Sequence, residues 1–157
     1  MTHPREDVVV ARYLVTAQFG LIGLLAVVPR GHGWPVPVGL QVVLAVLVLV
    51  GVAIMGLGAT SLGKGLTATP LPNQHAQLRT GGLYRFVRHP IYTGLLLSAT
   101  AYALASGSVA RVVVLALLIA LLNVKARWEE ARLARRFDGY AAYAARTPRF
   151  VPLRVRR

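Results

Sequence analysis

The chain has 157 residues, of which 55% are hydrophobic and 15% are charged, and its formal net charge is +13. So few charged residues argue against a soluble globular domain, and the lack of cysteine excludes disulfides, thiolate metal sites and thiol nucleophiles. The basic residues flank long apolar stretches, which makes anionic membrane lipid a better partner for the positive charge than nucleic acid.

Residues 8–28 form the first apolar stretch and have the length of a membrane-spanning helix, which needs ~20 residues. Acidic and basic residues are mixed before it, at Arg5, Glu6 and Asp7, and no small-residue cleavage site follows it. This pattern does not fit a cleaved signal peptide, so we expect the helix to be retained. Residues 29–35, rich in Pro and Gly and containing Trp34, predict a turn at the membrane interface.

Three further apolar stretches follow along the chain. Residues 38–58 carry no charge and contain several glycines that would permit close helix packing. Residues 91–105 and 109–124 are shorter, and a Ser-Gly-Ser turn joins them as a tight helical hairpin. No proline interrupts residues 124–145, so the last helix can continue beyond the bilayer. We therefore predict an all-α fold: one domain, residues 1–157, forming a polytopic membrane bundle of about four transmembrane helices with a cytoplasmic C-terminal helical segment.

The distribution of Lys and Arg predicts the orientation of the bundle. With the N-terminus in the cytoplasm, sixteen of the 18 basic residues lie on the cytoplasmic side, and Arg30 and Arg111 remain outside. Cytoplasmic loops carry such an excess of positive charge. We therefore expect a multi-pass integral membrane protein whose polar segments, residues 59–90 and 125–157, meet on the cytoplasmic side.

The stretch from residue 78 to residue 92 combines a glycine turn with a helix start. Gly81 and Gly82 permit positive φ, and Pro90 suits the first turn of a helix. Arg88 and His89 then lie at the mouth of this helix, where free amides and the helix dipole favour a carboxylate. The alternatives are a cationic snorkelling anchor for Arg88 and His89, and an aromatic membrane belt for the nearby tyrosines.

A second polar stretch, residues 125–133, contains two adjacent acids, Glu129 and Glu130, within a basic tail. One interpretation is surface pairing at helical spacing with Lys125, Arg127 and Arg132, worth only ~0.3–0.5 kcal/mol for each pair. The other follows from an antiparallel hairpin, which would point the face with Lys125 and Glu129 at the Arg88–His89 turn. There a carboxylate can bind a cationic ligand group and the lysine an anionic one.

Together these two stretches resemble the isoprenylcysteine carboxyl methyltransferase family, which is related in core design to the phospholipid N-methyltransferases. The resemblance covers about residues 78–152 and rests on their order and spacing. It departs from the family at Lys125, where Arg is usual, and in an interval between Phe137 and Tyr140 that is one residue shorter. The residues that carry it are Gly82-Leu83-Tyr84, Arg88-His89-Pro90-Ile91-Tyr92, Glu129-Glu130-Ala131-Arg132-Leu133, Phe137, Tyr140, Tyr143 and Pro148-Arg149-Phe150-Val151-Pro152.

The resemblance implies a transferase that uses S-adenosylmethionine, releases S-adenosylhomocysteine, and methylates a lipophilic small-molecule or prenylated acceptor among membrane lipids without a metal. Arg88 and Lys125 would bind the acceptor, and Arg88, His89 and Glu130 are the candidate catalytic residues, with His89 or Glu130 as a base where the acceptor must lose a proton. The expected cofactor-binding residues are Gln77, Leu78, Arg79, Tyr84, His89, Pro90, Ile91, Tyr92 and Glu129.

Two other functions stay open at this stage. A non-enzymatic membrane anchor that binds anionic lipid would explain the charge and the apolar stretches, but not the glycine turn and the acid pair together. A membrane reductase of related helical design would need a pocket for a nicotinamide cofactor, and the first two apolar stretches contain no polar motif that supplies one.

Overall fold

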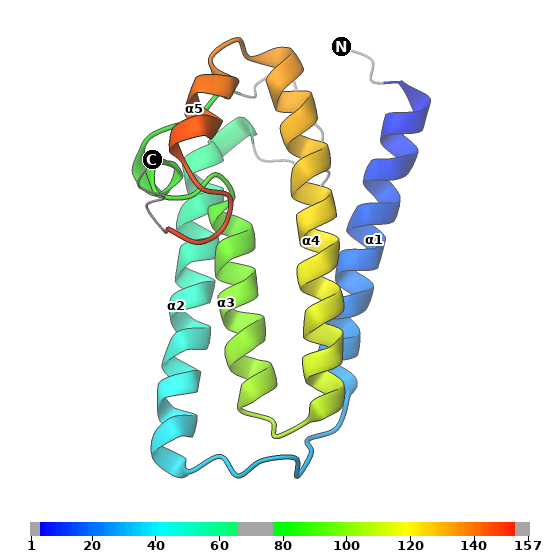
Figure 1. Cartoon of the computed structure of the whole chain (residues 1–157), viewed down its shortest axis with the longest axis vertical. Coiled ribbons are helices and arrows are strands. Elements are labelled where there is room, and N and C mark those ends of the chain that lie inside the picture. The colour runs from blue at the N-terminus through cyan, green and yellow to red at the C-terminus, as the bar shows by residue number, and fades with distance from the viewer. Residues whose placement is uncertain (1–3, 66–76, 153–157) are drawn as a thin grey trace.

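The computed structural model describes residues 4–65 and 77–152, and it confirms the predicted all-α fold. Within these residues there is no β-strand, and short 3₁₀ turns lie at Gly63–Gly65 (η1) and Gly82–Arg85 (η2). Figure 1 shows the longer helices side by side and a short helix over one end of the bundle. The helices are α1 (Arg5–Val27), α2 (Val38–Leu62), α3 (Pro90–Leu104), α4 (Val109–Arg136) and α5 (Tyr140–Arg146).

Three of these helices, α1, α2 and α4, are long and apolar enough to cross a membrane. The fourth apolar helix, α3, has 15 residues and is therefore about 22 Å long, less than the ~30 Å of the hydrocarbon layer. The number of full spans in the described chain is thus three plus one shorter helix, where the sequence suggested about four.

Helix α4 runs without a break from its apolar half into the charged tail. It continues beyond residue 124 to Arg136, because neither Pro nor Gly lies between Val109 and that residue. The helix does not extend to residue 145, since a turn at Asp138 and Gly139 separates it from α5. The same unbroken helix therefore carries a membrane span and the acid pair.

Glycines bring α2 and α3 into backbone contact. A methyl group added at Gly94 would lie 2.4 Å from the carbonyl oxygen of Gly51, and one added at Gly58 would lie 3.1 Å from the Ile91 side chain. Gly56, by contrast, faces open space. The expected close packing of α2 thus rests on two of its glycines, and they seat the start of α3 firmly against α2.

Helix α4 packs along α1, and both contribute to a core with the inner face of α3. The core consists of small and branched apolar side chains together with the ring of Tyr92. Its fully buried members include Leu118 and Leu122 of α4 and Ala103 of α3.

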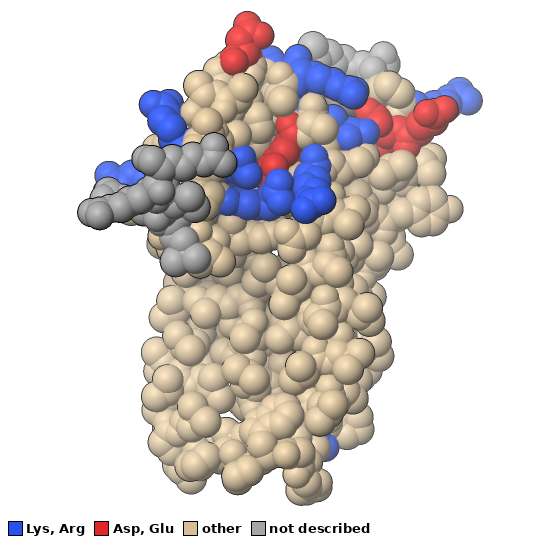
Figure 2. Space-filling view, viewed as in Figure 1, with Lys and Arg blue, Asp and Glu red and all other residues tan. Residues whose placement is uncertain are grey.

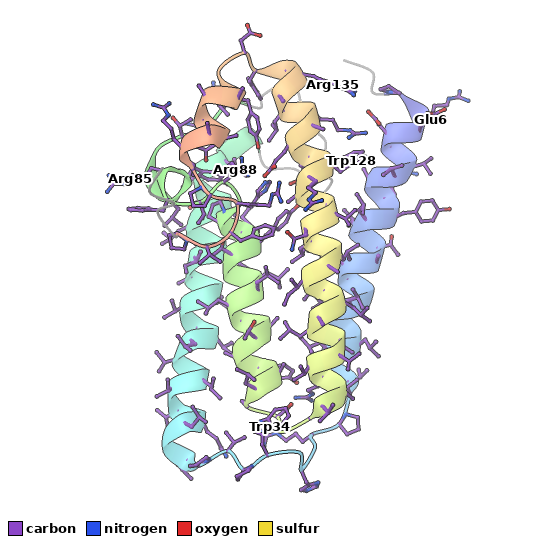
Figure 3. The ribbon with its side chains drawn as sticks, viewed as in Figure 1. Glu6, Trp34, Arg85, Arg88, Trp128 and Arg135 are labelled. Carbon is purple, nitrogen blue, oxygen red and sulfur yellow. The ribbon has the colours of Figure 1, made fainter. Side chains whose placement is uncertain are left out.

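Two turns lie together at the end of the bundle away from the charges. The Ser106–Ser108 turn contains Gly107 at φ 62°, as its tight hairpin requires. Gly31 and Gly33 donate backbone hydrogen bonds to the carbonyls of Ser106 and Gly107, at 3.0 and 2.8 Å. Trp34, labelled in Figure 3, adds a hydrogen bond to the carbonyl of Leu104. This end is therefore joined by main-chain contacts between distant parts of the chain.

Charged side chains gather at the other end, over the start of α1, the end of α4, and α5 (Figure 2). Arg30 and Arg111 belong to the opposite end, where the guanidinium of Arg111 donates to the carbonyl of Val28. The predicted tail arginines 154, 156 and 157, and the loop residues 66–76, lie outside the described residues. The described charges thus have the one-sided distribution on which the predicted orientation depends.

Candidate functional site

The start of α3 is held by the C-terminal tail. Pro90 begins the helix, as the sequence predicts, and His89 before it has φ −126° and ψ 67°, outside the helical region but short of a fully extended conformation. The backbone amides of Arg88 and His89 donate to the carbonyls of Pro148 and Arg149, at 2.9 and 3.1 Å. The Thr93 hydroxyl donates to the carbonyl of Phe150 at 2.8 Å. Residues 148–150 therefore run across the Arg88–His89 turn.

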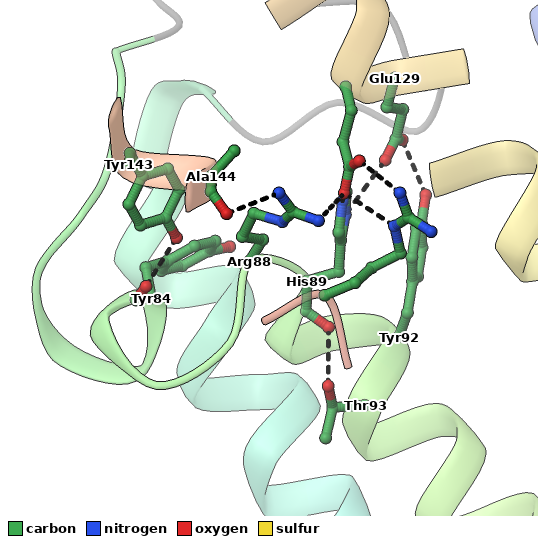
Figure 4. Close-up of polar contacts among 10 residues, drawn as sticks. Tyr84, Arg88, His89, Tyr92, Thr93, Glu129, Tyr143 and Ala144 are labelled. Carbon is green, nitrogen blue, oxygen red and sulfur yellow. Dashed lines mark hydrogen bonds and ion pairs between the residues drawn. The ribbon is translucent and has the colours of Figure 1, made fainter. Parts of the chain in front are cut away.

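Glu130 of α4 reaches this turn and binds three cationic or ionisable side chains, two of which, Arg88 and His89, are labelled in Figure 4. Arg149 donates to both of its oxygens, at 2.9 and 2.7 Å, in the bidentate geometry that favours arginine. Arg88 lies 3.3 Å away, and Nε2 of His89 lies 3.0 Å away. The carboxylate thereby links α4, the start of α3 and the tail.

Glu129 binds the other side of the same histidine. One of its oxygens accepts a hydrogen bond of 2.7 Å from the Tyr92 hydroxyl, and the other lies 3.4 Å from Nδ1 of His89. The rings of His89 and Tyr92 stack with their centroids 5.3 Å apart, and the Phe150 ring meets both edge-on. His89 is thus enclosed by two carboxylates and two aromatic rings.

The surroundings of His89 favour its protonated form. Its side chain is 9% exposed, and this burial alone would lower the pKa. The hydrogen bonds and negative charges of Glu129 and Glu130 outweigh the burial and raise the pKa of His89 above 6.5. With a carboxylate at each ring nitrogen, the imidazolium can donate to both.

Tyr84 and Tyr143 form a second, buried cluster beside η2. The Tyr84 hydroxyl donates to the carbonyl of Gly58 at 3.2 Å, and the Tyr143 hydroxyl donates to the carbonyl of Tyr84 at 2.6 Å. Burial raises the pKa of Tyr143 to about 12, so this hydroxyl remains a donor at neutral pH. Tyr84 thus uses its hydroxyl to attach the glycine turn to α2, and Gly82 in that turn has the expected positive φ of 58°.

The remaining predicted site residues also lie at the charged end of the bundle, and they range from exposed to buried. Gln77 and Arg79 are exposed, and Leu78 is half-buried against the turn at Gly139. Pro90 and Ile91 lie against Gly58 of α2. Their predicted contacts with a cofactor stay predictions.

Lys125 is buried, with 5% of its surface exposed. Its ammonium donates to the Gln18 amide oxygen of α1 at 2.6 Å and lies 5.2 Å from the centre of the Tyr92 ring. The residue therefore lies beside the Glu129 and Tyr92 pair, on the side toward α1.

The interpretation of the acids as ordinary surface pairs is wrong. Glu129 and Glu130 are bound by side chains of α3 and the tail, while Arg132, one of the expected surface partners, pairs with Asp7 of α1. Glu129 instead reaches the Arg88–His89 turn, as the antiparallel hairpin predicted, and Glu130 reaches it as well, whereas Lys125 turns to Gln18 of α1.

Sequence reasoning did not assign roles to Arg149, Gln18 and Tyr140. Arg149 and Tyr140 lie within the tail that carries the family resemblance, so the only signal for them was that of the tail as a whole. Gln18 offered another signal, as a polar residue inside an apolar stretch.

Two buried polar atoms beside Glu130 lack a hydrogen-bond partner among the described residues. They are Nε of Arg88 and the hydroxyl of Tyr140, a residue that is 4% exposed. Unpaired buried polar groups are costly, so these atoms suit a polar ligand. The described residues contain no cluster of His, Asp and Glu side chains that could hold a metal ion.

The sequence of the chain is similar to that of a known protein family. The sequence model of the family described as phospholipid methyltransferase matches residues 39–139, a range that includes α2, α3 and α4. The chain is also 41% identical over 76 residues to the "Cobalt-zinc-cadmium resistance protein CzcN" of Cupriavidus metallidurans. That match covers 48% of this chain and 35% of the relative, so the chain spans about a third of its length. No solved structure matches the chain significantly.

Proposed function

Because the chain belongs to the phospholipid methyltransferase family, we propose that it transfers a methyl group from S-adenosylmethionine to a lipid-like acceptor and releases S-adenosylhomocysteine. The observation that carries this proposal is the contact of Glu129 and Glu130 with the Arg88–His89 turn. It brings carboxylates, cations and aromatic rings together where the apolar bundle ends.

We place the reaction on the cytoplasmic side of the membrane. Basic residues are concentrated at the end of the bundle that holds the site, and cytoplasmic segments of membrane proteins carry such an excess. A water-soluble donor reaches this end from the cytosol, and a lipid acceptor reaches it from the bilayer. A site at the cytoplasmic interface serves both molecules.

The residues at the site fit the polar groups of the donor. Glu129 is a carboxylate that can accept hydrogen bonds from ribose hydroxyls or an ammonium group. Helix α3 begins without a side-chain cap, and the free amides of its first turn suit the donor carboxylate. The unpaired Tyr140 hydroxyl and Arg88 Nε supply two further donors. Gln77, Leu78 and Arg79, with Tyr84, Pro90, Ile91 and Tyr92, would complete the binding site.

When bound, S-adenosylmethionine supplies a methyl group that its sulfonium charge has already activated. The protein must then align the acceptor with that methyl group and keep water away. Residues 148–150 and the Phe150 ring cover His89 and Tyr92, which supports a role in excluding water. Arg88 and Lys125 would orient the acceptor.

An acceptor that must lose a proton needs a base. Glu130 is surrounded by Arg88, His89 and Arg149, which stabilise its negative charge and weaken it as a proton acceptor. We therefore assign Glu130 to ordering these cations. Glu129 accepts a short hydrogen bond from Tyr92 and has His89 beside it, and we assign it to the donor.

The class of acceptor follows from the position of the site at the membrane. An isoprenylcysteine carboxylate and a phospholipid amine both combine an apolar chain with a reactive headgroup. The carboxylate would need no base and would be attracted by Arg88 and Lys125. A lysine lacks the bidentate fork of an arginine, so the headgroup would be held as a charge rather than by paired hydrogen bonds.

The test is an activity screen of the purified protein in lipid nanodiscs. The nanodiscs are incubated with S-adenosylmethionine carrying a labelled methyl group and a membrane lipid extract, and mass spectrometry identifies any labelled product. Calorimetry with S-adenosylhomocysteine measures binding at the donor site, and Glu129→Ala serves as the control. A protein that binds neither donor nor product is not a methyltransferase, and preferential binding of a reduced nicotinamide dinucleotide would favour the reductase alternative.

A further inference from the structure

Lys125 and Glu129 are spaced to pair with each other but do not. They lie four residues apart on α4, and oppositely charged residues at this spacing are neighbours on a helix surface. No ion pair joins them among the described residues; Glu129 binds Tyr92 and His89, whereas Lys125 binds Gln18. Some other contact must therefore compete for the ammonium.

That contact comes from the interior of α1. Gln18 lies about 20 Å along the helix from its first residue, Arg5, within a membrane-spanning stretch. Lysines near the end of a membrane helix usually extend their ammonium toward the interface. Side chains on a helix lean toward its N-terminus, so Lys125 leans toward the apolar half of α4, where the Gln18 amide oxygen receives it at 2.6 Å. The amide satisfies a buried charge without neutralising it.

The position of the ammonium relative to the site has a chemical consequence. It lies 5.2 Å from the centre of the Tyr92 ring, and the hydroxyl of that ring binds Glu129. A positive charge thus borders the aromatic wall of the proposed site from the membrane side. A lipid headgroup that enters from the bilayer would meet this charge next to Tyr92.

We propose that Gln18 is a positioning residue that keeps the Lys125 ammonium out of an ion pair with Glu129, so that the ammonium can bind the anionic headgroup of a lipid acceptor. The proposal rests on the proposed function only in treating the bound lipid as the methyl acceptor. The binding of an anionic lipid can be measured without methyl transfer. It makes α1, which lies outside the matched family range, a part of the site.

The chain offers a selective probe, because Lys64 and Lys125 are its only lysines. Protein labelled with ¹³C-lysine in phosphatidylcholine nanodiscs gives two side-chain signals, and Lys64→Arg assigns them. In the wild type we expect nuclear Overhauser contacts between Lys125 and the Tyr92 ring. We expect oleate to shift the Lys125 signal, whereas oleyl alcohol and acetate at equal concentration leave it in place. A shift caused equally by acetate would mean that the ammonium binds any small anion, and would overturn the lipid assignment.

Two substitutions at Gln18 separate the position of the ammonium from its charge. Gln18→Met keeps the side-chain length but removes the oxygen, so Lys125 should lose its contacts with Tyr92 and the affinity for oleate should fall about tenfold, the effect of losing a hydrogen bond to a charged group. Gln18→Glu should keep the contacts with Tyr92 but neutralise the ammonium, and oleate binding should fall as well.

The matched control is Gln41→Met, the same change in the other glutamine of a membrane helix. Gln41 lies near the start of α2, where its amide donates to the carbonyl of Val36, away from Lys125. This variant should bind oleate like the wild type. Unchanged oleate affinity and unchanged Tyr92 contacts in Gln18→Met would overturn the proposal. Binding of S-adenosylhomocysteine, measured on the same samples, reports separately on the proposed methyltransferase function.

Discussion

Tyr92 of α3 donates its hydroxyl to Glu129 of α4 across 2.7 Å, and this hydrogen bond joins the two halves of the bundle at the charged end. The same ring stacks on His89 and borders the Lys125 ammonium. One aromatic side chain therefore connects the carboxylate, the imidazole and the lysine of the proposed site.

Glu129→Ala should abolish detectable binding of S-adenosylmethionine while the protein still inserts and folds. The substitution removes the carboxylate proposed to bind the donor and leaves Glu130 with its three partners. Calorimetry in detergent measures the affinity, and circular dichroism verifies the helical content. Wild-type affinity in the alanine variant would reject the role of Glu129.

Tyr92→Phe should reduce activity less than Tyr92→Ala. The phenylalanine loses only a hydrogen bond to a carboxylate, worth ~1.5–3 kcal/mol, and keeps the stacking on His89. The alanine loses this packing as well, and truncating a buried aromatic ring costs ~3–5 kcal/mol. Initial rates of methyl transfer and thermal unfolding of both variants provide the comparison. Equal losses in the two variants would show that the ring itself contributes nothing.

Gly94→Ala should destabilise the bundle by ~1–3 kcal/mol, the usual cost of overpacking a core. The added methyl group would lie 2.4 Å from the Gly51 carbonyl and would push α3 away from α2. Gly56→Ala, on the packing partner α2, is the control: the added methyl group meets nothing within 4 Å and should be neutral or stabilise the helix by up to ~1 kcal/mol. Thermal unfolding in detergent measures both. Similar melting temperatures for the two variants would contradict the close packing.

Arg149→Lys should reduce methyl transfer relative to the wild type nearly as much as Arg149→Ala does. The guanidinium donates to both oxygens of Glu130, and a lysine cannot reproduce this pair of hydrogen bonds. We expect a fall of about tenfold in each variant, as for a lost charged hydrogen bond. Arg146→Ala, at an exposed position on α5, controls for the loss of one tail charge. Full activity in the lysine variant would mean that charge alone suffices at this position.

His89 should make the stability of the protein depend on pH. Because its folded pKa is raised above the unfolded value near 6.5, protonation stabilises the folded state. The stabilisation is complete below about pH 6.5 and is lost as the pH rises through the higher folded pKa. Thermal unfolding between pH 6 and pH 9 should show this loss in the wild type, whereas His89→Gln should lack it. A wild-type profile that stays flat, or that rises with pH, would contradict the imidazolium between two carboxylates.

The sequence allowed much of the fold and the pairing at the site to be predicted, because these features follow from local rules. The lengths of the apolar stretches predicted the long helices, and Pro90 and Gly107 marked a helix start and a tight turn that the structure contains. Antiparallel helices joined by a short turn bring the start of one beside the end of the other. The approach of Glu129 to His89 followed from this geometry.

Contacts that depend on distant parts of the chain were not predictable in this way. The tail at Pro148 crosses the start of α3 through backbone hydrogen bonds, which carry no side-chain pattern in the sequence. The Tyr84 hydroxyl binds a carbonyl of α2, and Gln18 meets a lysine more than a hundred residues away. The spacing of residues along one helix says nothing about such partners.

The backbone hydrogen bonds between the Gly31–Gly33 turn and Ser106–Gly107 join the two connecting loops at the end of the bundle away from the charges. One of these loops links α1 to α2 and the other links α3 to α4, so both fasten the helix pair α1 and α4 to the helix pair α2 and α3. Any separation of the two helix pairs must then be widest at the charged end, where Tyr92 and Glu129 meet.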